Sequence, residues 1–209
     1  MTTTLRYKNP ENLLGQEAKN KFAAWKDKWE KDGKKPLIYL AAHIYGYTND
    51  KDEEMRKNNS RIVDLLEESG FAVFLPQRDN PFGVLKGNSI GWEMAIVDEL
   101  AIRIADIVFA VGGFGKDTSW EIGLAAGLGK LTLLHLPTRE AAEYHKEDWM
   151  LLRNISLLFA SAEAADVMRE SIASPPTCGI FPIVDAGEIP MKIHLLHSID
   201  KMGKVITGG

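Results

Sequence analysis

The chain has 209 residues, of which 45% are hydrophobic and 26% charged, and its formal net charge is −4. This length is enough to bury one sizeable core and too short for two full-sized domains, so we expect one domain with appendages. Lysine and arginine are scattered among acids and form no stripe, which excludes the surface typical of proteins that bind nucleic-acid polymers.

Cysteine usage and hydropathy indicate a cytoplasmic protein. Cys178 is the single cysteine, so no intrachain disulfide can form and a reducing compartment is expected. Residues 1–35 are charged and lack the apolar core of a signal peptide. No later stretch approaches the roughly 20 apolar residues of a membrane span. We therefore expect neither export nor membrane insertion.

Residues 12–31 show helical spacing of apolar side chains, as in an amphipathic surface helix. The stripe consists of Leu14, Ala18, Phe22, Trp25 and Trp29. The two tryptophans could pack on the domain or on a second subunit, and packing on the domain is favoured. We predict that residues 1–35 are a helical extension without a catalytic role.

From residue 36 onward, short apolar runs alternate with stretches of helical periodicity, as buried parallel strands alternate with crossover helices. The expected strands are 37–42, 71–75, 107–111, 131–136 and 156–159, and the main expected helices are about 52–69, 91–105, 118–128 and 162–172. Over residues 36–173 this pattern predicts an α/β fold: a doubly wound, Rossmann-like or flavodoxin-like, mostly parallel five-stranded sheet with helices on both faces. The tail, 174–209, shows no clear periodicity.

In such sheets, ligands bind beyond the carboxyl ends of the strands. The loops after Ala42, Leu75 and Val111 should therefore converge on the site. The loop from Pro76 to Ser89 is longer than the usual two to six residues of such connections, and loops of that length are often functional.

The most informative segment begins where Val111 leads into a glycine-rich turn that contains Gly113, ahead of a helix that carries Glu121. Such a turn exposes backbone N–H groups, and a helix N-terminus favours a carboxylate or phosphate. The same pattern also fits a purely structural capping box, in which one of residues 117–119 caps the helix and Glu121 is its partner. The segment alone leaves both interpretations open.

Three segments resemble the nucleoside 2-deoxyribosyltransferase family, including its branch that hydrolyses deoxynucleotides and cytidine monophosphates. They are Ile38-Tyr39-Leu40-Ala41-Ala42-His43-Ile44, Asp98 placed eight residues before Asp106, and Trp120-Glu121-Ile122-Gly123-Leu124-Ala125 followed by Gly129-Lys130. They match, in order, the family's opening strand, its acid before the next strand and its glutamate at a helix start. The resemblance spans roughly half of the chain.

The resemblance implies cleavage of the N-glycosidic bond of a nucleoside by two carboxyl groups with different roles. Glu121 would attack C1′ and form a covalent glycosyl-enzyme. Asp98 would carry or relay the proton to the departing base, which requires a raised pKa. Tyr39 would hydrogen-bond Glu121 and hold its rotamer. If a second base then attacks, the enzyme is a transferase, and if water attacks, it is a hydrolase.

Asp98 and Tyr39 can also be interpreted without catalysis, as a surface acid and a core tyrosine. Apolar residues surround Asp98 in the sequence, and burying a lone carboxylate there would be costly without a task or a partner. This cost favours the functional interpretation of Asp98.

Several further residues are expected to bind the substrate. At least one of residues 77–80, which follow Pro76, should read the base, and Gln77 and Asp79 are the candidates. Gly113 is a candidate through its turn, and His43 through its place after the first strand.

Two departures from the family pattern bear on the substrate. Where the nucleotide-hydrolysing branch carries Ser and Arg for a 5′-phosphate, this chain has His43, Tyr45 and Gly115, which favours a nucleoside without phosphate. Asp117 stands four residues before Glu121, whereas the family's substrate-orienting aspartate stands six before. Whether Asp117 takes over that role stays open.

Residues 149–154 are similar to the segment with which family members complete a neighbouring subunit's site. The resemblance implies that Asn154 meets the sugar 5′-hydroxyl in a partner's pocket, and it implies a homodimer or a higher even-numbered oligomer. Besides this second copy, the expected partners are a nucleoside and a free base, with no nucleic-acid polymer and no membrane.

Two other functions compete with this interpretation. The lysine-decarboxylase-like phosphoribohydrolases share a Gly-Gly-x-Gly turn before a helix with glutamate, but Val111 and Lys116 depart from their signature. A non-catalytic nucleotide-binding sensor would need only the glycine turn and the helix dipole. His194 and His197 lack nearby cysteine or acid partners, so we predict no metal site and no cofactor.

Overall fold

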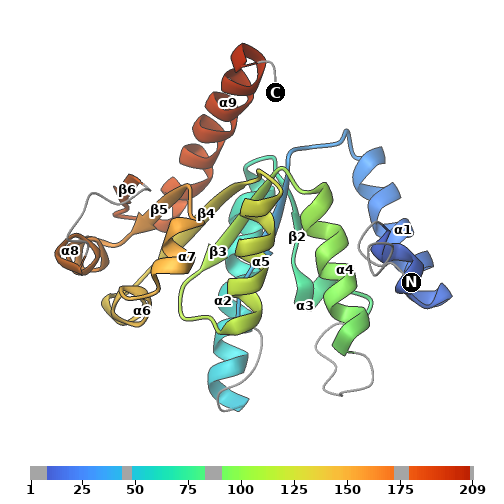
Figure 1. Ribbon diagram of the computed structural model, residues 1–209, viewed down its shortest axis with the longest axis horizontal. Coiled ribbons are helices and arrows are strands. Elements are labelled where there is room, and N and C mark those ends of the chain that lie inside the picture. Colours follow the sequence, from blue (N-terminus) through green and yellow to red (C-terminus); the bar gives the residue numbers. More distant parts are fainter. Residues whose placement is uncertain (1–8, 44–48, 83–90, 172–178, 208–209) are drawn as a thin grey trace, which may run out of the picture.

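The computed structural model of the chain describes residues 9–43, 49–82, 91–171 and 179–207 (Figure 1). The expectations that concern Tyr45, Cys178 and the part of the long loop at 83–89 fall outside these ranges. Among the helices in the described ranges, none has the length and apolar character needed to cross a membrane.

The centre of the fold is a six-stranded parallel sheet in the order β2-β1-β3-β4-β5-β6. The strands are β1 (Leu37–Ala41), β2 (Ala72–Phe74), β3 (Ile107–Val111), β4 (Leu131–Leu136), β5 (Leu157–Ala160) and β6 (Gly179–Pro182). The predicted α/β class and the first five strands are confirmed. The sixth strand corrects the predicted number. It lies in the tail, where the prolines at 175, 176 and 182 interrupt the strand pattern of a four-residue edge strand with mostly exposed side chains.

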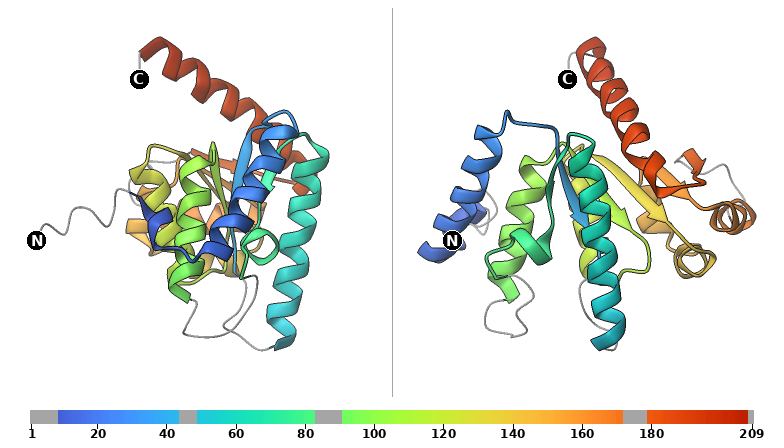
Figure 2. Two further views of the ribbon diagram at one scale, coloured as in Figure 1. Left: turned by 90° about the vertical axis from the view of Figure 1, so that its right-hand side faces the viewer. Right: turned by 180° about the vertical axis from the view of Figure 1, so that it is seen from behind.

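Helices cover both faces of this sheet, as a doubly wound fold requires (Figures 1 and 2). The helices of five or more residues are α1 (Gln16–Lys31), α2 (Asn49–Glu68), α4 (Gly91–Ile104), α5 (Lys116–Gly127), α6 (Arg139–His145), α7 (Trp149–Arg153), α8 (Ala162–Ser171) and α9 (Ile189–Thr207). Each face of the sheet has its own buried hydrophobic cluster. One cluster contains side chains from α1, α4, α5, α6, α7 and α8, and the other contains side chains from α2 and α9.

The alternation of side chains along β1 divides this strand between the two clusters. Tyr39 belongs to the cluster on the side of α4 and α5, whereas its neighbours Ile38 and Leu40 belong to the cluster on the side of α2. A strand buried on both faces needs apolar residues at successive positions, which explains the continuous apolar run.

β1 is the point at which the winding of the sheet reverses. The chain passes from β1 to β2 on one side, and β3 pairs with β1 on the other. The helix that follows β1, α2, covers one face, and the helix that follows β2, α4, covers the opposite face. Ligands of such sheets bind at this switch point, beyond the carboxyl ends of the strands. The fold therefore directs the search for a site to the ends of β1 and β3.

The N-terminal helix α1 packs on the domain, as expected for its tryptophan stripe. The ring of Trp25 meets the ring of Phe74 edge-on, with centroids 4.9 Å apart. Trp29 is buried, and its indole Nε1 donates a hydrogen bond to the carbonyl of Lys35, 2.9 Å away, just before β1. The extension therefore completes the core beside β2 and α4.

The C-terminal helix α9 is anchored at its beginning. Ile189 and Ile193 lie in the cluster on the side of α2, Leu196 packs against it and His197 is buried, while the helix beyond them extends away from the sheet (Figure 1). Asp106, just before β3, accepts a hydrogen bond from the backbone N–H of Leu37 at 2.9 Å and so links the starts of β3 and β1.

We predict that Trp29→Ala destabilises the whole domain. The substitution removes a buried indole and its hydrogen bond to the Lys35 carbonyl, and such truncations lower the free energy of unfolding by about 3–5 kcal/mol. Urea unfolding measures this loss. Lys28→Ala, on the exposed side of the same helix, is the control and should change stability by less than about 0.5 kcal/mol. An equal effect of both substitutions would show that α1 is not part of the core.

Candidate active site

Tyr39 and Glu121 form a buried hydrogen bond at the switch point of the sheet. The hydroxyl of Tyr39, from the middle of β1, donates to Oε1 of Glu121 at 2.5 Å. Tyr39 is fully buried and Glu121 is 8% exposed. The predicted contact between the two residues is therefore present, although they lie far apart in the sequence.

Glu121 is held differently from the sequence expectation. Helix α5 begins at Lys116 behind Gly115, which caps it without a side-chain hydrogen bond. The capping-box interpretation is therefore wrong, and Glu121 lies in the second turn instead of the first. The glycine at 115 adopts an extended conformation and starts the helix two residues early. The donor to Glu121 is the Tyr39 hydroxyl, which comes from β1 and not from the first turn of α5.

Asp98 lies on α4 beside this pair, and a buried amide holds it. Nδ2 of Asn80 donates to Oδ1 of Asp98 at 3.0 Å. The Tyr39 hydroxyl also interacts with Asp98. Side chains from β1, α4, α5 and the end of α3 (Pro76–Asp79) thus meet at one place.

Burial shifts the proton equilibria of all three groups. Loss of water raises the pKa of Asp98 to about 7, against the hydrogen bonds from Asn80 and Tyr39, which lower it. Burial and the nearby charge of Asp98 raise the pKa of Glu121 well above its usual value, while the Tyr39 hydrogen bond lowers it. Burial and both carboxylates raise the pKa of Tyr39, which therefore stays a protonated donor.

These shifts mean that the two carboxyl groups hold one proton between them near neutral pH. Two close buried carboxylates resist ionising together. Because the Tyr39 hydroxyl donates to Glu121 at 2.5 Å, it stabilises the ionised form of Glu121. Asn80 donates to Asp98 in the same way, so a neutral donor meets each carboxyl group of the pair.

The glycine turn after β3 is closed by a residue that the sequence analysis missed. Gly113 has a positive φ of 88°, and its N–H donates to Nε2 of the fully buried His145 at 3.2 Å. Nδ1 of His145 lies 2.9 Å from Oδ2 of Asp148. Burial lowers the pKa of His145, and Asp148 opposes this shift. A neutral ring with its proton on Nδ1 fits both contacts. No local pattern links His145 to a turn 32 residues earlier.

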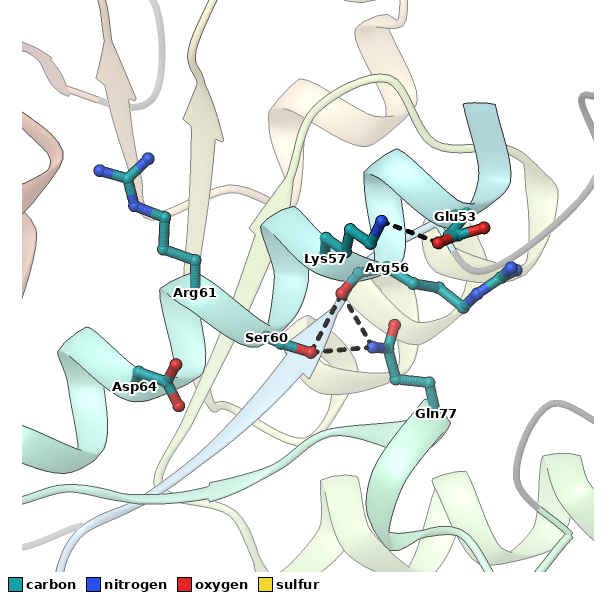
Figure 3. Close-up of a pocket in the computed structure, with 7 residues that line it drawn as sticks. All are labelled: Glu53, Arg56, Lys57, Ser60, Arg61, Asp64 and Gln77. Atoms are coloured by element: carbon teal, nitrogen blue, oxygen red, sulfur yellow. Dashed lines mark hydrogen bonds and ion pairs between the residues drawn. The ribbon is translucent and has the colours of Figure 1, made fainter. Parts of the chain in front are cut away.

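Gln77 is directed against α2 instead of toward the carboxyl pair. Its Nε2 donates to the carbonyl of Arg56 at 3.0 Å and to Oγ of Ser60 at 3.3 Å (Figure 3). These residues border a surface hollow of about 320 Å³. The side chains of Arg56 and Arg61, which also line the hollow, point in different directions (Figure 3), so the hollow does not gather their charge.

Asp79 and His43 have partners within the chain. Oδ2 of Asp79 accepts from the backbone N–H of Leu75 at 2.8 Å, and both of its oxygens accept from Arg78. His43 follows β1, and its Nε2 lies 3.4 Å from Asp52. His43 lies near the carboxyl end of β1 and Asp79 near that of β2. The hydrogen bond of Asp79 to Leu75 ties α3 to the end of β2.

Asp117 and Asn154 both lie at helix ends. Asp117 is exposed at the start of α5, and its charge raises the pKa of both Asp98 and Glu121. Asn154 ends α7, where its Nδ2 donates to the carbonyl of Met150 at 2.9 Å. In the single chain, Asn154 therefore serves its own helix.

No group of three or more histidine, cysteine or acidic side chains is placed to hold a metal ion within the described ranges. His194 and His197 have other contacts: Nε2 of His194 lies 2.7 Å from the carbonyl of Ser69, and Nε2 of His197 lies 3.9 Å from Asp106.

The structure is similar to solved structures from several bacteria. One is the 2-deoxyribosyltransferase from Bacillus psychrosaccharolyticus, at 25% identity, covering 63% of this chain and 90% of that chain with a TM-score of 0.42. Another is the CMP N-glycosidase from Clostridium botulinum, at 21% identity, covering 77% and 98% with a TM-score of 0.41. A third is a conserved protein from Enterococcus faecalis V583, at 13% identity, covering 76% and 97% with a TM-score of 0.47. The first two belong to the family that the sequence motifs resemble.

Comparison with protein-family models gave no match, and comparison with curated proteins gave none either.

We predict that Asp98 makes stability fall as pH rises. Its pKa is raised from 3.8 to about 7 in the folded chain, so its contribution is present below the unfolded value and is lost as pH passes through the folded value. Asp98→Asn, which carries no titrating proton, should be more stable than the native chain at pH 8 by up to about 4 kcal/mol, and the difference should shrink toward pH 4. Urea unfolding at both pH values measures it. A constant difference would show that Asp98 titrates normally.

Proposed function

We propose that the protein cleaves the N-glycosidic bond of a nucleoside through a covalent intermediate on Glu121 and transfers the sugar to another base. The observation that carries this proposal is the cluster in which the half-buried Asp98 meets the buried side chains of Glu121, Tyr39 and Asn80. It combines a carboxylate held by a phenol with a second carboxyl group whose pKa is raised to about 7.

The separation of roles in this cluster fits the chemistry of the bond. Cleavage builds positive charge at C1′ and negative charge on the leaving base, so a nucleophile and a proton donor are both needed. Glu121 and Asp98 interact with the same phenol, which supports the short separation of about 5–5.5 Å that a covalent, retaining route uses.

The proposed steps balance as follows. Oε1 of Glu121 accepts from Tyr39, so Oε2 attacks C1′ and forms an ester bond. The C1′–N bond breaks, its electron pair goes to the base nitrogen, and Asp98 gives its proton to the base. A second base then attacks C1′, the ester bond breaks, and the incoming base returns a proton to Asp98.

The charge of the site supports a nucleoside without a 5′-phosphate. The charge of Asp117 raises the pKa values of Asp98 and Glu121, so three carboxyl groups lie close together. The N–H of Gly113, which a phosphate could otherwise use, donates to His145. A dianionic phosphate would meet repulsion at this place.

Hydrolysis is the second candidate, with water as the acceptor in place of the base. Asp98, once it has lost its proton, could equally activate a water molecule. Incubation with a deoxynucleoside, with and without a second free base, separates the functions. Exchange of the base indicates a transferase and release of free sugar indicates a hydrolase. If neither product forms, the proposal fails and a non-catalytic sensor is favoured.

We predict that Glu121→Ala reduces base release below about one percent of the native rate without unfolding the chain, because a covalent nucleophile has no substitute. The rate of base release at saturating substrate measures the loss. Glu163→Ala, an exposed acid at the start of α8, is the control and should keep the native rate. A Glu121→Ala variant that retains more than about one percent would assign the nucleophile to another residue.

We also propose that the active form is a homodimer or a higher even-numbered oligomer in which Asn154 reaches the partner's pocket. Apolar side chains beside the site support this proposal: Trp120 is 48% exposed, Trp149 58% and Met150 86%. Such exposure near a catalytic cluster is typical of a surface that a second subunit covers.

Mixing two inactive variants tests this shared site. Glu121→Ala chains and Asn154→Ala chains should regenerate part of the activity after subunit exchange, because mixed oligomers pair one intact Glu121 with one intact Asn154. Base release before and after mixing measures the recovery. The shared site would be refuted if Asn154→Ala alone were fully active. It would also be refuted if the two variants exchanged subunits and the mixture still released no base.

A further inference from the structure

Asn80 is a buried amide whose hydrogen bonds are all directed inward. It follows α3 and is 4% exposed. Its Oδ1 accepts from the backbone N–H of Phe82 at 3.1 Å, and its Nδ2 donates to the carbonyl of Met94 at 3.1 Å and to Oδ1 of Asp98 at 3.0 Å. Three partners from two segments therefore hold one side chain.

These partners leave the amide only one orientation. A flipped amide would place its oxygen against two acceptors, the Met94 carbonyl and the Asp98 carboxyl group, and its NH₂ against the N–H of Phe82. Such a flip would lose three buried hydrogen bonds, each costly to leave unmade. Asn80 is thus a fixed donor to Asp98. Its amide makes its hydrogen bonds to Phe82, Met94 and Asp98, whereas a residue that recognises a base needs a free donor or acceptor.

We propose that Asn80 is a positioning residue that reserves Oδ1 of Asp98, so that Asp98 gives its proton to the leaving base from Oδ2. This inference rests on the proposed function, because it assigns the atom from which the acid acts. A proton on Oδ1 would oppose the N–H of Asn80 donor to donor, whereas a proton on Oδ2 leaves Oδ1 as the acceptor.

The contact also strengthens during the reaction. As the C1′–N bond breaks, its electron pair goes to the base nitrogen, the Oδ2 proton moves to that nitrogen, and Asp98 becomes a carboxylate. The Asn80 N–H then donates to a charged acceptor, and hydrogen bonds to charged groups are about twice as strong as neutral ones. An interaction that is stronger later in the reaction lowers the barrier.

The other groups around Asp98 act with or against Asn80. From β1, the Tyr39 hydroxyl lowers the pKa of Asp98, as Asn80 does. From α5, the charge of Asp117 raises it, and the charge of Asp98 in turn raises the pKa of Glu121. Loss of the Asn80 donor therefore shifts the balance toward the neutral acid.

The experiment compares pH profiles of Asn80→Ala, Asn80→Asp and the native chain. Activity that needs protonated Asp98 falls as pH rises through its pKa, so loss of the donor should move this descending limb to higher pH by about one unit. Base release at saturating substrate should also fall, by about 10- to 100-fold, for bases that need a proton. A 7-methylated purine nucleoside, whose leaving base is already cationic in the substrate, should lose less.

Asn80→Asp keeps the acceptor for the Phe82 N–H and has nearly the same shape as the native side chain, so it removes chiefly the donor. It serves if Asn80→Ala fails to fold. Its added carboxyl group should move the limb upward at least as far.

Asn59→Ala is the matched control. Asn59 is 2% exposed, and its Nδ2 likewise donates to two acceptors, the carbonyl of His43 at 2.8 Å and Oε1 of Gln77 at 3.1 Å. Its loss removes an equivalent buried amide without touching Asp98. The descending limb of Asn59→Ala should stay at the native pH, whatever happens to its stability.

A direct titration of the Asp98 carboxyl carbon by NMR separates the two proposals, because it needs no substrate. A higher pKa of Asp98 in Asn80→Ala and Asn80→Asp supports the inference. An unchanged pKa of Asp98 in the variants overturns the inference. So does a descending limb of the pH profile that stays in place together with an unchanged preference between leaving bases. If the native chain still releases base, the proposed function stands in either case. If the native chain releases no base, the proposed function and the proton-delivery role of Asn80 both fail, and the titration then reports only whether Asn80 sets the Asp98 equilibrium.

Discussion

The hydrogen bond between Tyr39 and Glu121 is the constraint on which the site depends. A carboxyl group buried to 8% exposure is costly unless a donor meets it, and the Tyr39 hydroxyl is that donor. The bond requires the middle of β1 to face the second turn of α5. The place of β1 between β2 and β3 and the early start of α5 at Lys116 both serve this requirement.

The donors that touch the buried carboxyl groups are a phenol and an amide, and both are neutral. A lysine or arginine in their place would lower both pKa values and fix Asp98 and Glu121 as permanent anions. Neutral donors stabilise without fixing the charge, so one proton can be held by the pair and given away. The same chemistry explains why burial is tolerated here: each carboxyl group keeps a hydrogen-bond partner in either protonation state.

More of the fold than of the candidate site could be predicted from the sequence. Continuous apolar runs identified five strands, because strands buried on both faces need them. The edge strand β6 escaped prediction because it contains a proline and closely follows two more, which disturbs the strand pattern. Tyr39, Glu121 and Asp98 could be named through motif spacing. The holding residues could not: Asn80 reaches Asp98 across 18 residues and His145 reaches Gly113 across 32. Such contacts depend on how the loops fold onto the sheet, which local periodicity does not encode.

The aromatic contacts of α1 connect the N-terminal extension to the candidate site. The ring of Tyr39 stacks on Phe74 at 5.7 Å, and Phe74 in turn receives the edge of Trp25. The wall behind the phenol is therefore built by a helix that precedes the first strand. Interiors transmit strain because they are closely packed. A substitution at Trp25, which is separated from Glu121 by the rings of Phe74 and Tyr39, therefore affects the position of the Tyr39 hydroxyl without any contact to a substrate. Replacing this helix with another would change how the Tyr39 ring packs.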